Sequence, residues 1–482
     1  MRPSDSASSA SAETRRSVTD ATISRKGMRR SVSAPSRGNN ARDAHDRLRS
    51  ATVDADVIVV GGGFAGLVAA RDLGDAGRSV VLVEARDRLG GRAWYREIPG
   101  TGVKAEYGAA WVFPESQTAL SEEVARAGVP LRASDPTSSI AWLVDGVLRT
   151  DAIALISEAL RAAPAIDGAF ERLVRGRPTV QTTRSDAWDD LDVPVTSWLE
   201  TNRVPAEATS FMQAFAAIMG GGEPSHMSML GLLLDAVSEG YRFDEFLGDV
   251  GSTFAEGSAS LVDAIAGQSR ADVRLLSPVV RVRSTDDGVT ADIAGGGEVR
   301  ASAAVVALPL HVWVDVAFDP PLSAAKHRAA IGGHAGAATK ALAIANHVPG
   351  RALGIGWPAA LQGVVVGGPV SGGHLVTGFS GTRSIRADDR GAIERAIRDY
   401  FPNAQVDVAH GHDWVTDPYS KGTWFAPKPG WYAVDPSSRL STEGRITFAG
   451  SDIADEGTGW IEGALRTGRR AATEVIRILS GD

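Results

Sequence analysis

Residues 56–85 read DVIVVGGGFAGLVAARDLGDAGRSVVLVEA, and this stretch decides the fold of the chain. In the run DVIVV the four residues after Asp56 are continuously apolar, as expected for a central parallel strand that is buried on both faces. Leu67, Ala70 and Leu73 follow at helical spacing, Gly77 closes the helix, and a second apolar run, SVVLVEA, comes next. Strand, helix and strand in this order predict an α/β fold with a parallel sheet.

The turn between the first strand and the helix has the spacing of a dinucleotide-binding site. Gly61, Gly63 and Gly66 form the pattern G-x-G-x-x-G, and Glu84 ends the second strand. Gly61 permits a tight turn, Gly63 lets the backbone approach a pyrophosphate, and Gly66 lets helix and strand pack closely. The helix N-terminus offers N–H groups to phosphates, and Glu84 can accept hydrogen bonds from the adenosine ribose. The pattern therefore predicts a Rossmann-like dinucleotide site.

The residues after Glu84 extend this motif. The segment ARDRLGGRAW carries a second glycine pair, Gly90 and Gly91, followed by Arg92. It resembles the flavin-containing monoamine oxidase family, whose fingerprint continues E-A-x-x-R-x-G-G-R. In that family the segment lies along the pyrophosphate and ribityl chain of FAD, where an Arg92 guanidinium would bind phosphate oxygens through a bidentate fork. The resemblance implies FAD as the cofactor.

The resemblance recurs along the chain in the order of the family. The matching segments are EYGAAWV (106–112), EGSASLVDAIA (256–266), the alternating strand SPVVRVR (277–283), DPYSKGTWFAPKPG (417–430) and ITFAGSDIADEGTGWIEGALRTGRRAA (446–472). Besides the residues named above, the resemblance implies a cofactor-binding role for Phe64, Ala65, Ala85, Arg86, Ala109, Ala110, Trp111, Val279, Gly450, Ser451, Asp452 and Ile461.

Three residues are implied as catalytic. Lys340, in GAATKALAIA, matches the family lysine that holds a water against flavin N5. Trp424 and Trp460 match two aromatic residues, often both Tyr, that flank the approach to the flavin. Two indoles favour a compact hydrophobic or aromatic amine, held by π-face electrostatics worth about 0.5–2 kcal/mol. Two plainer interpretations stay open: the tryptophans fill the core, or Lys340 emerges at the solvent edge of its strand.

The implied function is an FAD-dependent amine oxidase. A hydride equivalent would pass from the amine α-carbon to flavin N5, the imine would hydrolyse to an aldehyde or ketone, and oxygen would reoxidise the flavin to give hydrogen peroxide. Because the amine must be neutral when it reacts, we expect few carboxylates beside its nitrogen. Thr423 stands where some family members carry a flavin-linked Cys, so FAD is expected to be noncovalent. The alternatives are a desaturase or dehydrogenase of the same fold with another electron acceptor, and a non-catalytic flavin-binding interaction protein.

The order of the motifs predicts two interleaved domains. A Rossmann-like FAD-binding domain would combine residues 51–135, 252–315 and 411–482, and an α+β substrate-binding domain would combine residues 136–251 and 316–410. In the second domain DAIALISEALRAAPAI and FMQAFAAIMG predict helices, whereas GHAGAATKALAIA and GGHLVTGFSG predict strands.

The composition excludes several classes of protein. The 482 residues include no Cys, which excludes disulfides, thiolate metal sites and a Cys nucleophile. The longest nearly apolar stretch, 57–70, is shorter than the roughly 20 residues that cross a bilayer, so we expect no membrane partner. His410 and His412 form an H-x-H pair without a further ligand at metal-site spacing, so we expect no metal.

Residues 1–50 differ from the rest of the chain. They hold 11 basic and 5 acidic residues and almost no bulky apolar ones, which predicts a flexible basic arm. A transit peptide, or a true start at Met28, stays open. No aromatic residues interleave the charges, so we expect no nucleic-acid partner. We expect a cytoplasmic protein whose partners are the amine and oxygen, and the sequence leaves a homodimer open.

Overall fold

The computed structural model describes residues 53–134, 136–176, 186–239, 242–243, 247, 251–434 and 436–481, and the predictions for residues 1–50 lie outside them. The helices are α2 (Phe64–Asp75), α3 (Thr118–Ala127), α4 (Ile153–Arg161), α5 (Pro164–Gly176), α6 (Val195–Thr201), α7 (Ala206–Met219), α8 (Met229–Glu239), α9 (Ala259–Gln268), α10 (Ala324–Gly332), α11 (Arg390–Arg398), α12 (Pro436–Leu440) and α13 (Ile461–Ser480), with short 3₁₀ helices η1 (Asp186–Trp188), η2 (Pro224–His226), η4 (Leu310–Asp315) and η5 (Ser451–Ile453). The strands are β1 (Ala55–Val60), β2 (Val80–Val83), β3 (Tyr95–Glu97), β4 (Lys104–Glu106), β5 (Trp111–Val112), β6 (Leu131–Ala133), β7 (Ser139–Val144), β8 (Val147–Arg149), β9 (Ser252–Phe254), β10 (Asp272–Arg274), β11 (Val279–Ser284), β12 (Val289–Ile293), β13 (Glu298–Val306), β14 (Ala317–Asp319), β15 (Thr339–Asn346), β16 (Ala352–Trp357), β17 (Gly363–Val370), β18 (Gly373–Ser380), β19 (Gln405–Gly411) and β20 (Ile446–Phe448).

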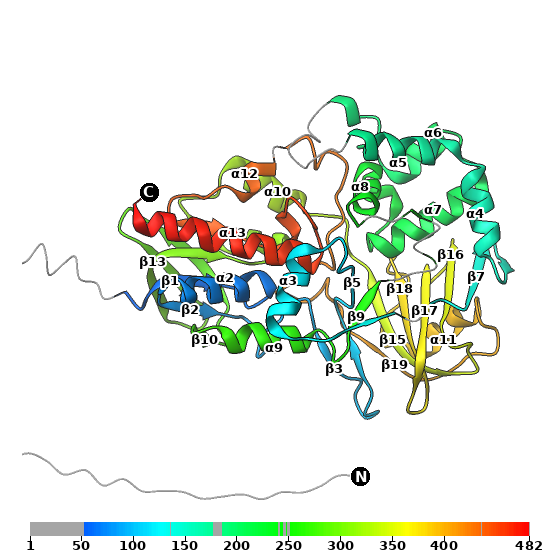
Figure 1. Ribbon diagram of the computed structural model, residues 1–482, viewed down its shortest axis with the longest axis horizontal. Helices are drawn as coiled ribbons and strands as arrows, with labels where there is room; N and C mark the ends of the chain where they lie inside the picture. The colour runs from blue at the N-terminus through cyan, green and yellow to red at the C-terminus, as the bar shows by residue number, and fades with distance from the viewer. Residues whose placement is uncertain are drawn as a thin grey trace, which may run out of the picture. The chain divides into compact units, whose positions relative to one another are not determined.

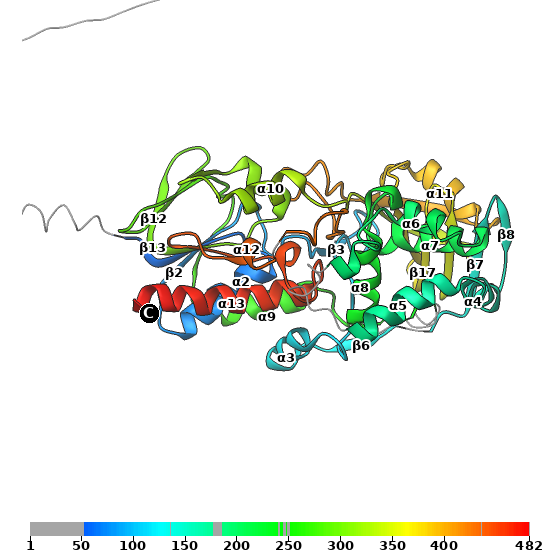
Figure 2. The same cartoon turned by 90° about the horizontal axis from the view of Figure 1, so that it is seen from above.

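The first sheet contains the predicted central strand. Its order is β10-β2-β1-β13-β12-β11-β14, with β20 also paired to β13, and β1 runs parallel to both β2 and β13. Val57 and Val59 of β1 pack against α2, α9 and α13, whereas Ile58 and Val60 pack on the opposite side against η4, α10 and α12. Figures 1 and 2 show α13 and α2 side by side along one face of this sheet. The prediction of an α/β fold with a central buried strand is confirmed.

The glycine turn between β1 and α2 explains why the helix begins where it does. Gly61 has a φ of +105°, in the region that favours glycine. A Cβ on Gly66, in the first turn of α2, would lie 1.9 Å from the carbonyl oxygen of Gly61, so only glycine permits this approach. The helix ends at Asp75, and Gly77 follows with a φ of +77°, as its predicted closing residue should.

The second large sheet has the order β19-β15-β18-β17-β16-β7-β8. Its pairs are antiparallel except for β16 and β7, which run parallel. One face packs against α4–α8 and the other against α11, as Figure 1 shows. The predicted helices form α4, α5 and α7, and the predicted strands form β15 and β18. Two smaller sheets, β3-β4 and β5-β9-β6, complete the strand pairing.

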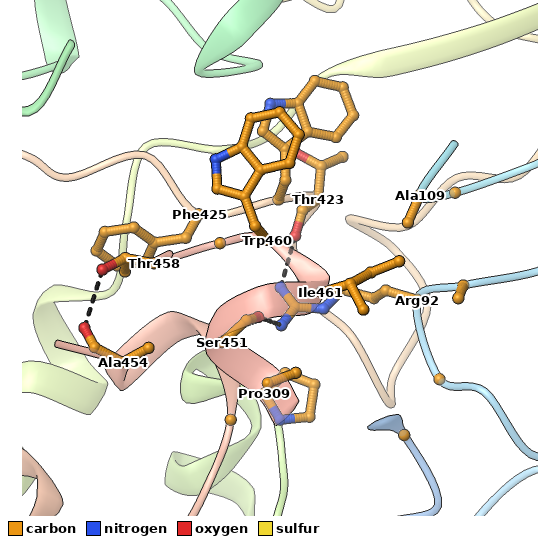
Figure 3. A pocket seen from close by; sticks show the side chains of 18 of the residues that line it. Arg92, Ala109, Pro309, Thr423, Phe425, Ser451, Ala454, Thr458, Trp460 and Ile461 are labelled. Atoms are coloured by element: carbon orange, nitrogen blue, oxygen red, sulfur yellow. Dashed lines mark hydrogen bonds between the residues drawn. The ribbon is translucent and has the colours of Figure 1, made fainter. Parts of the chain in front are cut away.

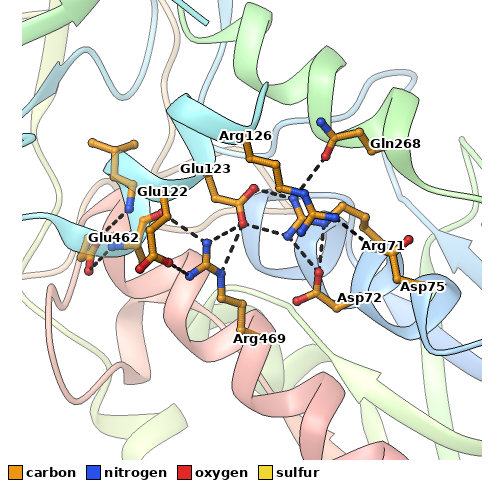
Figure 4. A network of polar contacts seen from close by, with 11 residues as sticks. Arg71, Asp72, Asp75, Glu122, Glu123, Arg126, Gln268, Glu462 and Arg469 are labelled. Atoms are coloured by element: carbon orange, nitrogen blue, oxygen red, sulfur yellow. Dashed lines mark hydrogen bonds and ion pairs between the residues drawn. The ribbon is translucent and has the colours of Figure 1, made fainter. Parts of the chain in front are cut away.

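A buried ion-pair network joins three helices that are distant in sequence (Figure 4). Glu123 of α3 accepts hydrogen bonds from Arg71 of α2 at 2.8 Å and from Arg469 of α13 at 2.6 Å. The Arg71 and Glu123 side chains are each only 1 % exposed. Glu462 of α13 also accepts hydrogen bonds from two N–H groups in the first turn of α3.

None of the described helices combines the length and the apolar character needed to cross a membrane.

Candidate active site

A cavity of about 880 Å³ lies where the two large sheets and their helices meet. Its volume is within the range of roughly 300–1,000 Å³ that is typical of ligand sites. Every site residue predicted from the sequence lines it, except Gly66 and Asp452. The fold therefore brings together segments that extend from the first strand to the last helix.

Bare backbone forms one wall of the cavity. A Cβ on Gly61 would lie 2.6 Å from the carbonyl oxygen of Ala307, and a Cβ on Gly91 would lie 3.3 Å from the Cα of Gly63. Only residues without a side chain allow these close approaches of backbone to backbone, and Gly61, Gly63 and Gly91 line the cavity with main-chain atoms near the N-terminus of α2. A pyrophosphate needs such close access to backbone N–H groups and to the positive end of a helix dipole, so these residues fit FAD.

Glu84 lies at the end of β2 with its carboxylate fixed. It is 4 % exposed, and its oxygens accept hydrogen bonds from the backbone N–H groups of Gly62 at 2.7 Å and Arg86 at 2.9 Å. The Arg86 guanidinium points to the opposite segment and contacts Asp417 and Ser420, each at 2.7 Å. Arg86 therefore joins the β2 end to the loop that carries DPYSKG.

Arg92 connects the second glycine pair to the C-terminal segment (Figure 3). Its terminal nitrogens donate to the carbonyl oxygen of Thr423 at 2.7 Å, the carboxylate of Asp452 at 2.6 Å and the hydroxyl of Ser451 at 3.1 Å. Burial alone would raise the pKa of Asp452, but Arg92 and the Leu310 N–H stabilise its carboxylate and the pKa falls to about 2. Both ends of the guanidinium contact protein here, and its binding to phosphate stays a prediction.

Two stacked histidines lie close enough to Asp452 for its charge to affect their pKa values. The His311 and His334 rings are 4.1 Å apart between centroids, and His311 accepts a hydrogen bond from the backbone N–H of His334. Burial lowers the pKa of His334 to about 3, while the charge of Asp452 opposes this shift. Both rings are therefore neutral at neutral pH.

Lys340 is buried in β15 with its ammonium inside the cavity wall. It is 2 % exposed, and Nζ donates to the carbonyl oxygen of Gly108 at 2.7 Å. The ammonium lies 5.2 Å from the ring centre of Trp111 and 5.9 Å from that of Phe379. Burial lowers the pKa of Lys340 to about 8, and the charge of Glu106 opposes that shift. The alternative that Lys340 emerges at the solvent edge is wrong.

The two predicted tryptophans line the same cavity, and each is held by its indole N–H. Trp424 donates to the carbonyl oxygen of Met219 at 2.6 Å, and its ring meets that of Phe379 edge-on. Trp460, directly before α13, donates to the carboxylate of Asp235 at 2.8 Å. Their ring orientations are therefore fixed by contacts from α7 and α8. Because both tryptophans line the cavity, the alternative that they only fill the core does not hold.

The sequence analysis missed the side chains that complete this part of the cavity. They are Phe113, Phe215, Leu232, Asp235, Leu353, Ile355, Val365, Phe379 and Tyr432. Asp235 carried a signal in the sequence, because it interrupts the apolar run of MLGLLLDAVSE in α8. The apolar residues carried none, since core and cavity walls use the same residue types. No group of three or more His, Asp or Glu that could hold a metal occurs among the described residues.

Residues 64–476 match the family model described as flavin containing amine oxidoreductase. The chain is 31% identical to the (S)-6-hydroxynicotine oxidase of Paenarthrobacter nicotinovorans, over 87% of this chain and 99% of that protein. It is 28% identical to the pseudooxynicotine dehydrogenase of Pseudomonas sp, over 89% of this chain and 88% of that protein. The cyclohexylamine oxidase from Brevibacterium oxydans IH-35A shares the fold, with a TM-score of 0.76 over 89% of this chain and 100% of that chain at 23% identity. The chain therefore belongs to the flavin-containing amine oxidoreductase family and is an FAD-dependent enzyme that acts on the CH–NH or CH–NH2 group of amines.

Proposed function

We propose that this enzyme oxidises compact hydrophobic or aromatic amines and uses molecular oxygen as its electron acceptor, with release of hydrogen peroxide. One observation carries the proposal. The cavity that contains the bare glycine wall at α2 also contains Lys340, Trp424 and Trp460. FAD, when bound, supplies the acceptor for the hydride equivalent from the amine α-carbon.

The cofactor would be held along the wall that joins the two sheets. We propose that the N–H groups behind Gly61 and Gly63 bind the pyrophosphate and that Glu84 accepts hydrogen bonds from the ribose. Arg92 would hold the C-terminal segment against the cofactor. The contacts of its guanidinium with Thr423 and Asp452 support this role. Thr423 carries no thiol, so we propose noncovalent FAD, which acid precipitation should release into the supernatant.

The substrate would lie against the indole faces of Trp424 and Trp460. Their N–H groups are engaged with Met219 and Asp235, which leaves the ring faces as the contact surface. Aliphatic and aromatic side chains cover the neighbouring wall and would exclude water from the reacting carbon. The names of two relatives, a hydroxynicotine oxidase and a pseudooxynicotine dehydrogenase, support a compact aromatic amine.

We propose that Lys340 assists the reaction with oxygen. A fixed cation in a dry wall stabilises negative charge that develops on oxygen more strongly than the same cation would in water. The ammonium can also hold the water that later hydrolyses the imine, because it has donors beyond the one bonded to Gly108.

An anaerobic amine panel tests the proposal. The FAD-loaded protein is mixed with alkyl, cycloalkyl, arylalkyl and N-heterocyclic amines, and bleaching of the visible flavin absorbance reports oxidation. We expect bleaching by a compact aromatic or cyclic amine, then recovery of the absorbance and formation of peroxide when oxygen is admitted. Bleaching with recovery only on addition of an artificial acceptor would make the enzyme a dehydrogenase. A flavin that every amine leaves oxidised would contradict amine oxidation.

The two predicted domains would have different functions. We propose that residues 51–135, 252–315 and 411–482 form the cofactor-binding domain and residues 136–251 and 316–410 the substrate-binding domain. The placement of β1 and β15 in different sheets supports this division, whereas β14 and α10, which fall within 316–410, pack with the first sheet. The cytoplasmic location and the homodimer stay predictions, for which cell fractionation and light scattering are the measurements.

A further inference from the structure

The wall that carries Trp460 also carries a negative charge. Asp235 lies on α8, lines the cavity, and accepts the Trp460 indole N–H at 2.8 Å. It is the first charged residue in MLGLLLDAVSE, a helix in which the leucines before it pack into the core. The Trp460 indole N–H is thus one of the groups that contact this carboxylate, and the residue still lines the cavity.

The hydrogen bond changes what the indole face can bind. A carboxylate that accepts an indole N–H draws the proton toward itself and leaves more electron density on the ring. That density strengthens the attraction between the ring face and a cation. Phe113 stands edge-on to Trp460, 5.5 Å between ring centres, and limits the directions in which the indole can turn. The phenol of Tyr432, whose pKa is raised by burial and by the charges of Asp192 and Asp235, stays neutral beside this group.

We propose that Asp235 and Trp460 form a cation-binding subsite and that the cavity therefore takes its amine as the ammonium ion, before the proton loss that oxidation requires. This inference deepens the proposed function and rests on it. It differs from the expectation that carboxylates would be scarce beside the amine nitrogen, because binding and reaction favour different protonation states of the amine. Simple alkylamines are cationic at neutral pH, with pKa values near that of Lys, about 10.4.

A pair of isosteric probes tests the subsite without turnover. Phenyltrimethylammonium carries a permanent charge and no ionisable proton, whereas tert-butylbenzene has the same shape and no charge. Binding of each probe to the FAD-loaded protein is measured by calorimetry or by displacement of a competing amine. We expect the wild-type protein to prefer the cation by about ten-fold or more, which corresponds to a single charge in a partly buried site.

Asp235→Asn keeps an oxygen that can accept the indole N–H but removes the charge. We expect it to weaken binding of the cation about ten-fold and to leave binding of tert-butylbenzene unchanged. Asp287→Asn, in the exposed turn between β11 and β12, makes the same change in net charge and should leave both probes unaffected.

Three outcomes would overturn the inference. In the first, Asp235→Asn binds both probes more weakly by the same factor. In the second, Asp235→Asn prefers phenyltrimethylammonium over tert-butylbenzene as strongly as the wild type does. In the third, the wild-type protein binds the two probes with equal affinity. The last result decides the matter even if Asp235→Asn does not fold. Failure of amine oxidation itself is a separate result, because it appears as an unbleached flavin in the wild-type protein and not in probe binding.

Discussion

At the scale of single residues, the buried ammonium of Lys340 is the feature that most needs a reason. One carbonyl oxygen, from Gly108, and two aromatic rings surround it, and Glu106 is the carboxylate whose charge acts on it. Such a group is expensive to bury, and its pKa falls as a result. The same arrangement keeps a cation in the cavity wall that can give up its proton near neutral pH.

Lys340→Met should slow the reaction of the substrate-reduced enzyme with oxygen by about ten-fold or more, because the cation that stabilises developing negative charge is lost. Flavin content should not change. In the wild-type enzyme the same rate should fall as the pH rises through about 8, where Lys340 loses its charge, and the variant should show no such fall. Stopped-flow absorbance measures both.

Lys104→Met, which removes an exposed lysine of β4, is the matched control and should behave as the wild type. A Lys340→Met enzyme that reacts with oxygen at the wild-type rate at every pH would remove this role from Lys340.

At the scale of elements, charge rather than apolar contact alone fixes α3 to α2 and α13. Glu123 accepts from two arginines at once, and burial of its carboxylate would raise its pKa if those arginines did not lower it. A buried carboxylate with two guanidinium partners has a defined geometry, so it fixes the position of α3 against α2 and α13. The same helix α13 begins beside Trp460, which places its first turn at the cavity.

Glu123→Ala should destabilise the protein by about 3–5 kcal/mol, because it leaves Arg71 buried without its main carboxylate partner. Replacing both partners, in Arg71→Met with Glu123→Leu, should cost clearly less, since no buried charge then remains. Urea unfolding followed by tryptophan fluorescence gives the free energies.

Glu122→Ala serves as the control for this network. Glu122 contacts the same Arg469 but its side chain is 67 % exposed, so its loss should change stability by no more than about 1 kcal/mol. If Glu122→Ala and Glu123→Ala lowered the free energy of unfolding equally, the buried Arg71–Glu123 pair would not be the source of this stability.

At the scale of the whole molecule, the neutral histidine pair and the Asp452 carboxylate link the stability of the fold to pH. Both His334 and Asp452 have pKa values below their ordinary ones, so the unfolded chain binds protons that the folded chain does not. The contribution of His334 is complete above pH 6.5 and is lost as the pH falls toward about 3. That of Asp452 is complete above pH 3.8 and is lost as the pH falls through about 2.

The thermal unfolding midpoint of the wild-type protein should therefore fall as the pH is lowered from 6.5 toward 3. In His334→Asn an amide oxygen can accept the Gly336 N–H bond without protonation, so the curve should be flatter over that range. His347→Asn, at an exposed position, should follow the wild-type curve. Parallel curves for wild type and His334→Asn in calorimetry would contradict this source of acid sensitivity.

The sequence predicted those parts of the molecule that depend on neighbours in the chain. The strand at 55–60, the glycine turn and α2 follow from local pattern, because Gly61 turns the chain with a positive φ and Gly66 approaches Gly61 within the same turn. The partner of Trp460 could not be predicted, since Asp235 is 225 residues away and meets it only after two helices pack. The contacts of Arg92 with Thr423 and Asp452 depend in the same way on tertiary structure.

The late position of β20 in the chain has a consequence for how the protein is made. This strand pairs with β13 through residues 446–448, and α13 follows it to cover the hydrophobic face of β1. A nascent chain on the ribosome must therefore carry α2 without its α13 partner through nearly all of translation. Premature termination anywhere ahead of residue 446 would yield a polypeptide that keeps the glycine motif but lacks the strand and helix that enclose it.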